Sequence, residues 1–100
     1  MYTTIRIYRG APGLAGALVA RSSEVGALMQ DVDGFESYQL LRTFDGAVSV
    51  TTCQDREGVE ASTRIAAGWL RSNLPNLVAT PPEVIQGESV LNLGRSPVPA

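Results

Sequence analysis

The stretch FESYQLLRTFDGAVSVTTCQ, residues 35–54, decides the fold of this chain. Asp45-Gly46 stands between two runs rich in β-branched and aromatic side chains, a pattern typical of a β-hairpin. Glycine adopts positive φ in such a turn without steric cost. The sequence therefore predicts two antiparallel strands, over 35–44 and 47–54, joined by a two-residue turn at Asp45-Gly46.

A strand over 2–9 and a helix over 14–30 are predicted ahead of this hairpin. Alternation divides the strand into two faces, with Thr3, Ile5 and Ile7 on one and Tyr2, Thr4, Arg6 and Tyr8 on the other. Apolar residues recur at helical spacing over 14–30, which predicts a stripe that covers a sheet. Ser22-Ser23 is the place in this helix that suits an irregular turn.

A second helix over 56–74 and a last strand over 83–91 are predicted after the hairpin. Asp55 suits the N-cap of this helix, and Pro75 stops it. We expect one domain over 1–93 and a flexible tail over 94–100.

The order of these elements, βαββαβ, is the ferredoxin-like arrangement of the α+β class. It predicts a four-stranded antiparallel sheet with two helices on one face. The other face is left uncovered, although both alternating sets of the strands contain large side chains. Face-to-face pairing of two such sheets in a homodimer is the simplest way to bury them.

Several kinds of chemistry are excluded by what the 100 residues lack. The chain contains eight Arg, no Lys, no His and one Cys, so it has no imidazole base, no lysine Schiff base and no Cys–His pair. No metal-ligand spacing and no phosphate-binding glycine loop occurs, so we expect no metal and no cofactor. A net charge of −2 gives no footprint for nucleic acid.

The location of the protein is predicted from the same absences. No stretch approaches the length of a membrane-spanning helix, so we expect no membrane partner. The N-terminus has no signal-peptide core. We expect a cytoplasmic protein.

Four polar or aromatic residues of the first two strands form the main candidate site. Alternation places Arg6 with Tyr8, and Tyr38 with Arg42. If these faces coincide, the cluster can bind a phenolate or carboxylate and stabilise an anionic intermediate. The alternative is that these side chains ring the dimer interface, where Tyr and Arg are enriched.

Two further residues each have a functional and a structural interpretation. Trp69 can stack on a planar ligand, or it can be a packing residue at the margin of an apolar stripe. Cys53, close to the start of the second helix, can be a reactive thiol or a buried structural cysteine. The lack of a partner residue favours the structural interpretation of Cys53.

The chain resembles the antibiotic biosynthesis monooxygenase-like family of dimeric α+β barrels, over nearly its whole length to about Leu91. The resemblance lies in four stretches, which are YTTIRIYRG (2–10), DGFESYQLLRT (33–43), AVSVTTCQDREGVEAS (47–62) and PPEVIQGESVL (81–91). Some members oxidise aromatic polyketide intermediates with O2 and use no metal or flavin. Others cleave haem with a His as axial ligand, and this chain contains no His. The functional Trp of the polyketide branch usually lies near the start of the second helix, where this chain carries Ala61-Ser62-Thr63. The functional Asn of that branch also has no counterpart, because no Asn occurs in the first three strands.

The resemblance and the candidate cluster together give two hypotheses. The first is a cofactor-independent monooxygenase that acts on a planar aromatic or phenolic small molecule. Tyr8, Tyr38 and Arg42 are then catalytic, and Arg6 and Trp69 bind the substrate. The alternative is a non-enzymatic small-molecule-binding or interaction module on the same dimeric fold.

Overall fold

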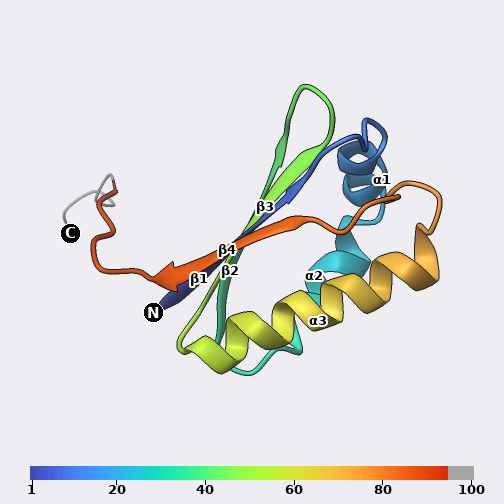
Figure 1. Ribbon diagram of the computed structural model, residues 1–100. Helices are drawn as coiled ribbons and strands as arrows, with labels where there is room; N and C mark the ends of the chain where they lie inside the picture. The colour runs from blue at the N-terminus through green and yellow to red at the C-terminus, as the bar shows by residue number, and fades with distance from the viewer. Residues whose placement is uncertain (95–100) are drawn as a thin grey trace, which may run out of the picture.

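A four-stranded antiparallel sheet with helices on one face forms the protein (Figure 1). The computed structural model describes residues 1–94, so the predicted tail lies outside the described residues except for Gly94. The elements follow the order β1 (Tyr2–Tyr8), α1 (Leu14–Ala20), α2 (Ser22–Gln30), β2 (Phe35–Arg42), β3 (Ala47–Cys53), α3 (Arg56–Asn73) and β4 (Glu83–Glu88). The strand order β2-β3-β1-β4 confirms the predicted ferredoxin-like α+β fold.

The helix predicted over 14–30 is two helices, so the prediction of one continuous helix was wrong. Arg21 separates α1 from α2 with φ −117° and ψ 32°. Its side chain bonds to the Glu24 carboxylate at 2.9 Å and to Asn73 Oδ1 at 3.2 Å, and it lies 5.0 Å from the centre of the Trp69 ring. The contacts with Asn73 and Trp69 tie Arg21 to α3 at the point where α1 and α2 separate.

The connection between β2 and β3 differs from the predicted two-residue turn. β2 ends at Arg42 and β3 begins at Ala47, which leaves four residues between them. The Thr43 N–H donates to the Gly46 carbonyl at 3.1 Å. Gly46 does not have positive φ, so the conformational reason given for it was also wrong.

Close packing is the reason for glycine at position 46. A Cβ there would lie 1.9 Å from the Tyr8 carbonyl oxygen. The neighbouring Asp45 carbonyl accepts from the Ala11 N–H at 2.8 Å, and its carboxylate accepts from the Gly10 N–H at 3.2 Å. The hairpin is therefore held against the loop that follows β1, a contact that no local pattern reveals.

The ends of α3 and β4 have identifiable causes. The Asp55 carboxylate accepts from the Gly58 N–H at 2.9 Å, which confirms the predicted N-cap. β4 ends at Glu88, three residues before the predicted end, because its partner β1 begins at Tyr2, opposite Glu88. Beyond that point the Ser89 N–H donates to the carbonyl of Met1.

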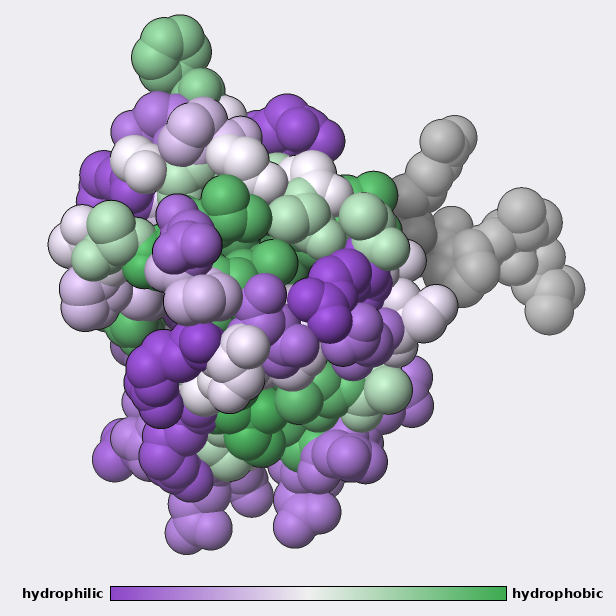
Figure 2. Space-filling view, turned by 90° about the vertical axis from the view of Figure 1, so that its right-hand side faces the viewer, coloured by the Kyte–Doolittle hydropathy of each residue, from purple (hydrophilic) through white to green (hydrophobic). Residues whose placement is uncertain are grey.

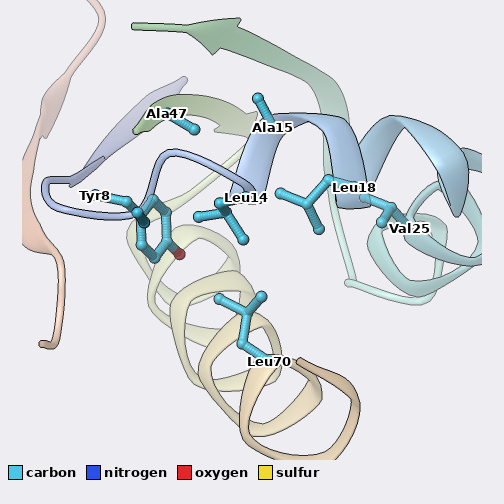
Figure 3. Packing of buried hydrophobic residues seen from close by; sticks show 8 residues of the cluster. Tyr8, Leu14, Ala15, Leu18, Val25, Ala47 and Leu70 are labelled. Carbon is cyan, nitrogen blue, oxygen red and sulfur yellow. The ribbon is translucent and has the colours of Figure 1, made fainter. Parts of the chain in front are cut away.

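The two faces of β1 have different surroundings. Thr4, Arg6 and Tyr8 are buried under the helices, whereas Ile5 and Ile7 lie on the uncovered face. The main core cluster lies between sheet and helices, and in Figure 3 the Tyr8 ring extends from β1 towards α3. Its buried members are Tyr8, Ala11, Leu14, Ala15, Leu18, Val25, Ala47 and Leu70.

Candidate functional site

Arg6 is a buried cation at the centre of the helix-covered face of the sheet. Its side chain is 1% exposed. Nε donates to Ser49 Oγ at 3.0 Å and Nη2 donates to Thr51 Oγ1 at 2.7 Å, both on β3. Nη1 donates to Ser62 Oγ at 3.2 Å and to Thr63 Oγ1 at 3.1 Å, both on α3. Four of its five N–H groups are thus held by neutral hydroxyls.

The charge of Arg6 is solvated by the protein but not neutralised. In the part of the chain that the structure describes, the ion pairs are Arg9–Glu83 and Arg21–Glu24, and no carboxylate lies within 4.0 Å of Arg6. Removing an ion from water costs several kcal/mol, which neutral hydroxyls repay only in part. An uncompensated buried cation beside a cavity makes Arg6 a candidate residue for binding an anion.

Two phenols, the buried Tyr8 and the half-buried Tyr38, border this guanidinium. Burial raises the pKa of Tyr8, while the Arg6 charge and a hydrogen bond from Arg6 act in the opposite direction. Burial likewise raises the pKa of Tyr38, again opposed by the charge of Arg6. Both phenols are therefore neutral at physiological pH, and each keeps a proton that it can donate in a hydrogen bond.

A cavity of about 630 Å³ opens beside Arg6 and Tyr8, a size that holds a small organic molecule. α3, the segment that joins it to β4, and the strands β1 and β4 enclose it. Its other lining residues are Thr63, Ala67, Leu70, Arg71, Leu74, Pro75, Val78, Ala79, Pro81, Pro82 and Val84. The lining is mainly apolar, contains two arginines and contains no carboxylate.

A much smaller space of about 20 Å³ lies on the other side of Arg6 and Tyr8. Tyr38 and Trp69 line it together with those two residues. A third hollow of about 460 Å³ lies between α2 and β2, and Tyr38 lines it as well. Figure 2, which looks onto the side of α1, α2 and the C-terminal end of α3, shows hydrophobic side chains in patches between hydrophilic ones.

Of the five residues predicted for the site, the structure brings four together. Arg6, Tyr8, Tyr38 and Trp69 line one space. Arg42 shares a cross-strand row with Tyr8, but Ala47 stands between them. Its exposed guanidinium lies near Gly16 of α1, and Arg42 lines none of the three cavities.

The residues that solvate Arg6 were not identified from the sequence. Ser49 and Thr51 alternate with Val48 and Val50 on β3, so polar side chains at every second position were the available signal. The alternation does not show which side chain these hydroxyls face. The strand register does, because it places Ser49 directly opposite Arg6.

Cys53 is a structural residue. It is fully buried, and burial and the nearby Asp55 charge raise the pKa of its thiol. A raised pKa disfavours the nucleophilic thiolate. Across residues 1–94, no three His, Cys, Asp or Glu side chains gather in a way that could hold a metal ion. No helix in the same range is long and apolar enough to cross a membrane.

Comparison with known proteins relates the fold to enzymes of two kinds. No protein-family profile matches the chain, and no curated protein matches its sequence. The haem degrader MhuD from Mycobacterium tuberculosis, with two haems bound in its active site, is 24% identical with a TM-score of 0.68, over 94% of this chain and 100% of that one. The monooxygenase ActVA-Orf6 of Streptomyces coelicolor, in complex with nanaomycin D, is 19% identical with a TM-score of 0.64, over 95% and 91% of the two chains.

A third similar structure has no assigned activity. NE2512 from Nitrosomonas europaea, a protein of unknown function, is 21% identical with a TM-score of 0.66, over 96% of this chain and 94% of that one. At these identities the likeness shows the fold. The resemblance to antibiotic biosynthesis monooxygenase-like proteins is thus confirmed at the level of the fold.

Proposed function

We propose that this protein is a cofactor-independent monooxygenase of the antibiotic biosynthesis monooxygenase-like type, which oxidises a planar phenolic or enolisable aromatic molecule. The observation that carries the proposal is the buried Arg6 guanidinium, which has no carboxylate partner in the described chain and borders the 630 Å³ cavity. The fold shared with ActVA-Orf6 and MhuD supports it, since both bind planar multi-ring molecules. A homodimer is part of the proposal.

Arg6 supports the first step of such a reaction by binding the substrate as an anion. A cationic guanidinium lowers the pKa of a bound phenol or enol, because it stabilises the ionised form. The substrate anion transfers one electron to O2, and the two radicals combine to a peroxide. Protonation gives a hydroperoxide, which loses water. In total, a CH2 group and O2 become a carbonyl group and water.

Tyr8 acts in this scheme as a donor and not as a base. Its raised pKa keeps it protonated, so it can hydrogen-bond to the substrate oxyanion and to the peroxide that follows, whereas Tyr38 does not line this cavity and lies on the other side of Arg6. The proton that leaves the substrate passes to water, because the cavity lining contains no carboxylate and the chain contains no imidazole. The apolar lining excludes bulk water and strengthens the attraction between Arg6 and the anion.

Haem does not fit the residues of this cavity as an iron-bound cofactor or substrate. The lining contains no His, Cys or Met, and its one phenol, Tyr8, has a raised pKa that disfavours the phenolate ligand.

A binding module is the second candidate. The observation in its favour is that no side chain lining the 630 Å³ cavity can act as a general base at neutral pH. In that case Arg6 and Tyr8 hold an anionic aromatic ligand, and no bond changes.

Oxygen consumption distinguishes the two candidates. The purified, metal-free protein is mixed with a panel of anthrones, quinols and flavonols in an oxygen-electrode cell, and products are identified by mass spectrometry. The monooxygenase proposal predicts uptake above the uncatalysed rate, one oxygen atom in the product, and loss of both in Arg6→Met. Saturable binding of these compounds with no uptake from any of them supports the binding module.

A further inference from the structure

The three cavities lie in series, and a tyrosine stands at each of the two boundaries between them. We call them the ligand cavity (630 Å³), the inner space (20 Å³) and the outer hollow (460 Å³). The residues that line both the ligand cavity and the inner space are Arg6, Tyr8 and Leu70. The residues that line both the inner space and the outer hollow are Leu18, Val25, Met29 and Tyr38. Tyr8 therefore supplies the hydroxyl group of one boundary, and Tyr38 supplies that of the other.

The outer hollow is open to solvent, whereas the inner end of the ligand cavity is buried. Ser22, Gln30 and Ser37 line the outer hollow and are exposed. Arg6 and Tyr8 are 1% and 5% exposed, so a group bound to them lies at the buried end of the ligand cavity. A ligand that fills this cavity separates that group from the solvent at the mouth. The remaining way to solvent leads past Tyr38.

The inner space has the size and the polar partners for one water molecule. A volume of about 20 Å³ suffices for a water, which needs two to four polar partners. Ser49 lines the inner space and accepts from Arg6 Nε at 3.0 Å. The Tyr8 oxygen accepts from Arg6, and the hydroxyls of Tyr38 and Ser49 hydrogen-bond to each other. Both phenol oxygens thus lie beside the same hydrogen-bonded pair, where a water can bridge them.

The proposed reaction needs a route for one proton, because the ligand must lose it to become an anion. The ligand cavity has no carboxylate, and the chain has no imidazole. A hydroxyl group both donates and accepts, so it can take up one proton while it passes on its own. A chain of hydroxyls and water therefore moves a proton without a resident general base.

We propose that Tyr8, a water in the inner space and Tyr38 relay the ligand's proton from Arg6 to the solvent in the outer hollow. The O–H bond of the ligand breaks as its proton passes to the Tyr8 oxygen, and Tyr8 passes its own proton to the water. The water passes one proton to Tyr38, and Tyr38 passes its own to a solvent molecule. Each group of the relay regains the proton that it gave, the ligand is left as an anion, and the solvent gains one proton. The relay rests on the proposed function in one respect, which is that the ligand ionises at Arg6.

Proton release from a bound phenol tests this proposal. 3-Hydroxyflavone is bound to the protein under nitrogen in an acidic buffer, and a stopped-flow pH jump to an alkaline buffer then starts its ionisation. The absorbance of the anion gives the rate, and the rate of binding does not enter because the ligand is already bound. The wild type is compared with Tyr38→Phe and with Ala66→Val, which fills the inner space and leaves both hydroxyls in place. Tyr2→Phe is the matched control, since Tyr2 is the third tyrosine of the chain and lines none of the three cavities.

The expected result is a slower ionisation with an unchanged end point. Tyr38→Phe and Ala66→Val should slow the formation of the anion by about tenfold or more, because each interrupts the relay. The affinity for the ligand and the final absorbance should stay those of the wild type, since neither residue lines the ligand cavity. Tyr2→Phe should match the wild type in rate, affinity and final absorbance.

Several results overturn the relay. These are a wild-type rate in Tyr38→Phe or in Ala66→Val, an equal slowing in Tyr2→Phe, and a weaker affinity for the ligand in Tyr38→Phe. A wild type that does not bind the ligand, or binds it and forms no anion, overturns the relay as well.

The outcomes also separate this proposal from the proposed function. Ionisation that depends on Tyr38, without O2 uptake in the oxygenation assay, supports the relay and contradicts the monooxygenase. O2 uptake together with equally fast ionisation in Tyr38→Phe supports the monooxygenase and contradicts the relay.

Discussion

At the level of single residues, the proposed function depends on the buried charge of Arg6. Ser62 and Thr63 donate their own hydroxyl protons to the Val59 carbonyl, so these hydroxyls keep a partner when Arg6 is removed. Since no carboxylate is paired with Arg6, its removal leaves no buried anion behind. The buried charge is therefore costly for stability, and binding of an anion is the reason we infer for it.

We predict that Arg6→Met folds with little change in stability. The free energy of unfolding should change by no more than about 2 kcal/mol, because the desolvation cost of the ion is relieved as its hydrogen bonds are lost. Urea denaturation measures the change. Leu14→Ala, in the fully buried core, is the comparison and should lose about 2–5 kcal/mol. A loss in Arg6→Met as large as in Leu14→Ala would show that Arg6 is a structural residue.

The two phenols predict a pH dependence of stability. Their folded pKa values lie above the ordinary tyrosine value of 10.0, so the folded chain holds these protons more tightly than the unfolded chain. Their contribution is complete below about pH 10 and is lost as the pH rises through the folded pKa. The pKa of the Cys53 thiol is likewise raised above its ordinary value of 9.0, so this group also lowers the stability as the pH rises above about 9. The free energy of unfolding should fall less steeply above pH 9 in Tyr8→Phe than in the wild type, and equal slopes would contradict the buried, neutral phenol.

The residues of the site were predictable only to the extent that alternation reveals them. Alternation paired Arg6 with Tyr8, and the structure places both beneath the helices with Tyr38. Alternation also placed Arg42 on the same face as Tyr38. Arg42 is the last residue of β2, however, so its side chain lies at the end of the sheet and lines none of the three cavities. The catalytic and binding roles of all five residues stay predictions. The 630 Å³ cavity was not predicted, because its walls include the irregular segment 75–82.

At the scale of the element, two glycines illustrate different uses of the same residue. Gly46 lies where the hairpin meets the carbonyl of Tyr8, and Gly26 lies on the exposed side of α2 with nothing within 4 Å of a built Cβ. The same substitution should therefore have opposite effects at the two positions.

We predict that Gly46→Ala lowers the free energy of unfolding by about 2–3 kcal/mol, because the new methyl group forces the hairpin away from β1. Gly26→Ala should raise it by about 0.5–1 kcal/mol through higher helix propensity. Thermal and urea denaturation of both variants check this. A neutral Gly46→Ala would contradict the close contact between the hairpin and Tyr8.

The elements themselves were mostly predictable, and the exceptions share one cause. The N-cap at Asp55 and the strands around Asp45-Gly46 follow from local chemistry, and the structure confirms them. The break at Arg21 and the four-residue connection at 43–46 depend on contacts with α3 and with the loop after β1. Such contacts between distant segments override local propensity.

At the level of the whole molecule, the sheet face that no helix covers carries large apolar side chains. Its apolar side chains stand in two adjacent cross-strand rows, formed by Leu41, Val48 and Ile7 and by Val50, Ile5 and Ile85. Leu41 and Ile85 are 43% and 50% exposed. A contiguous apolar surface of this kind is costly in water unless a second sheet covers it.

We predict a homodimer formed through this face. Light scattering coupled to size-exclusion chromatography should give twice the 10.6 kDa mass of the chain at micromolar concentration. Ile85→Asp and Leu41→Asp should shift it to the monomer, because each places a charge in the interface. Val19→Asp, at an exposed position of α1, should remain a dimer. A monomeric wild type would contradict the paired-sheet arrangement.

The most direct test of the central claim is whether Arg6 stabilises a bound aromatic anion. The absorbance of 3-hydroxyflavone is titrated against pH under nitrogen, free and bound to the wild type, to Arg6→Met and to the control Arg64→Met. We predict that the wild type and Arg64→Met lower the apparent pKa of the bound phenol by about one unit or more, the effect of a nearby buried cation, whereas Arg6→Met does not. Binding without a shift in the wild type, or the same shift in Arg6→Met, would contradict the assignment of Arg6 as the anion-stabilising residue and with it the proposed oxygenation.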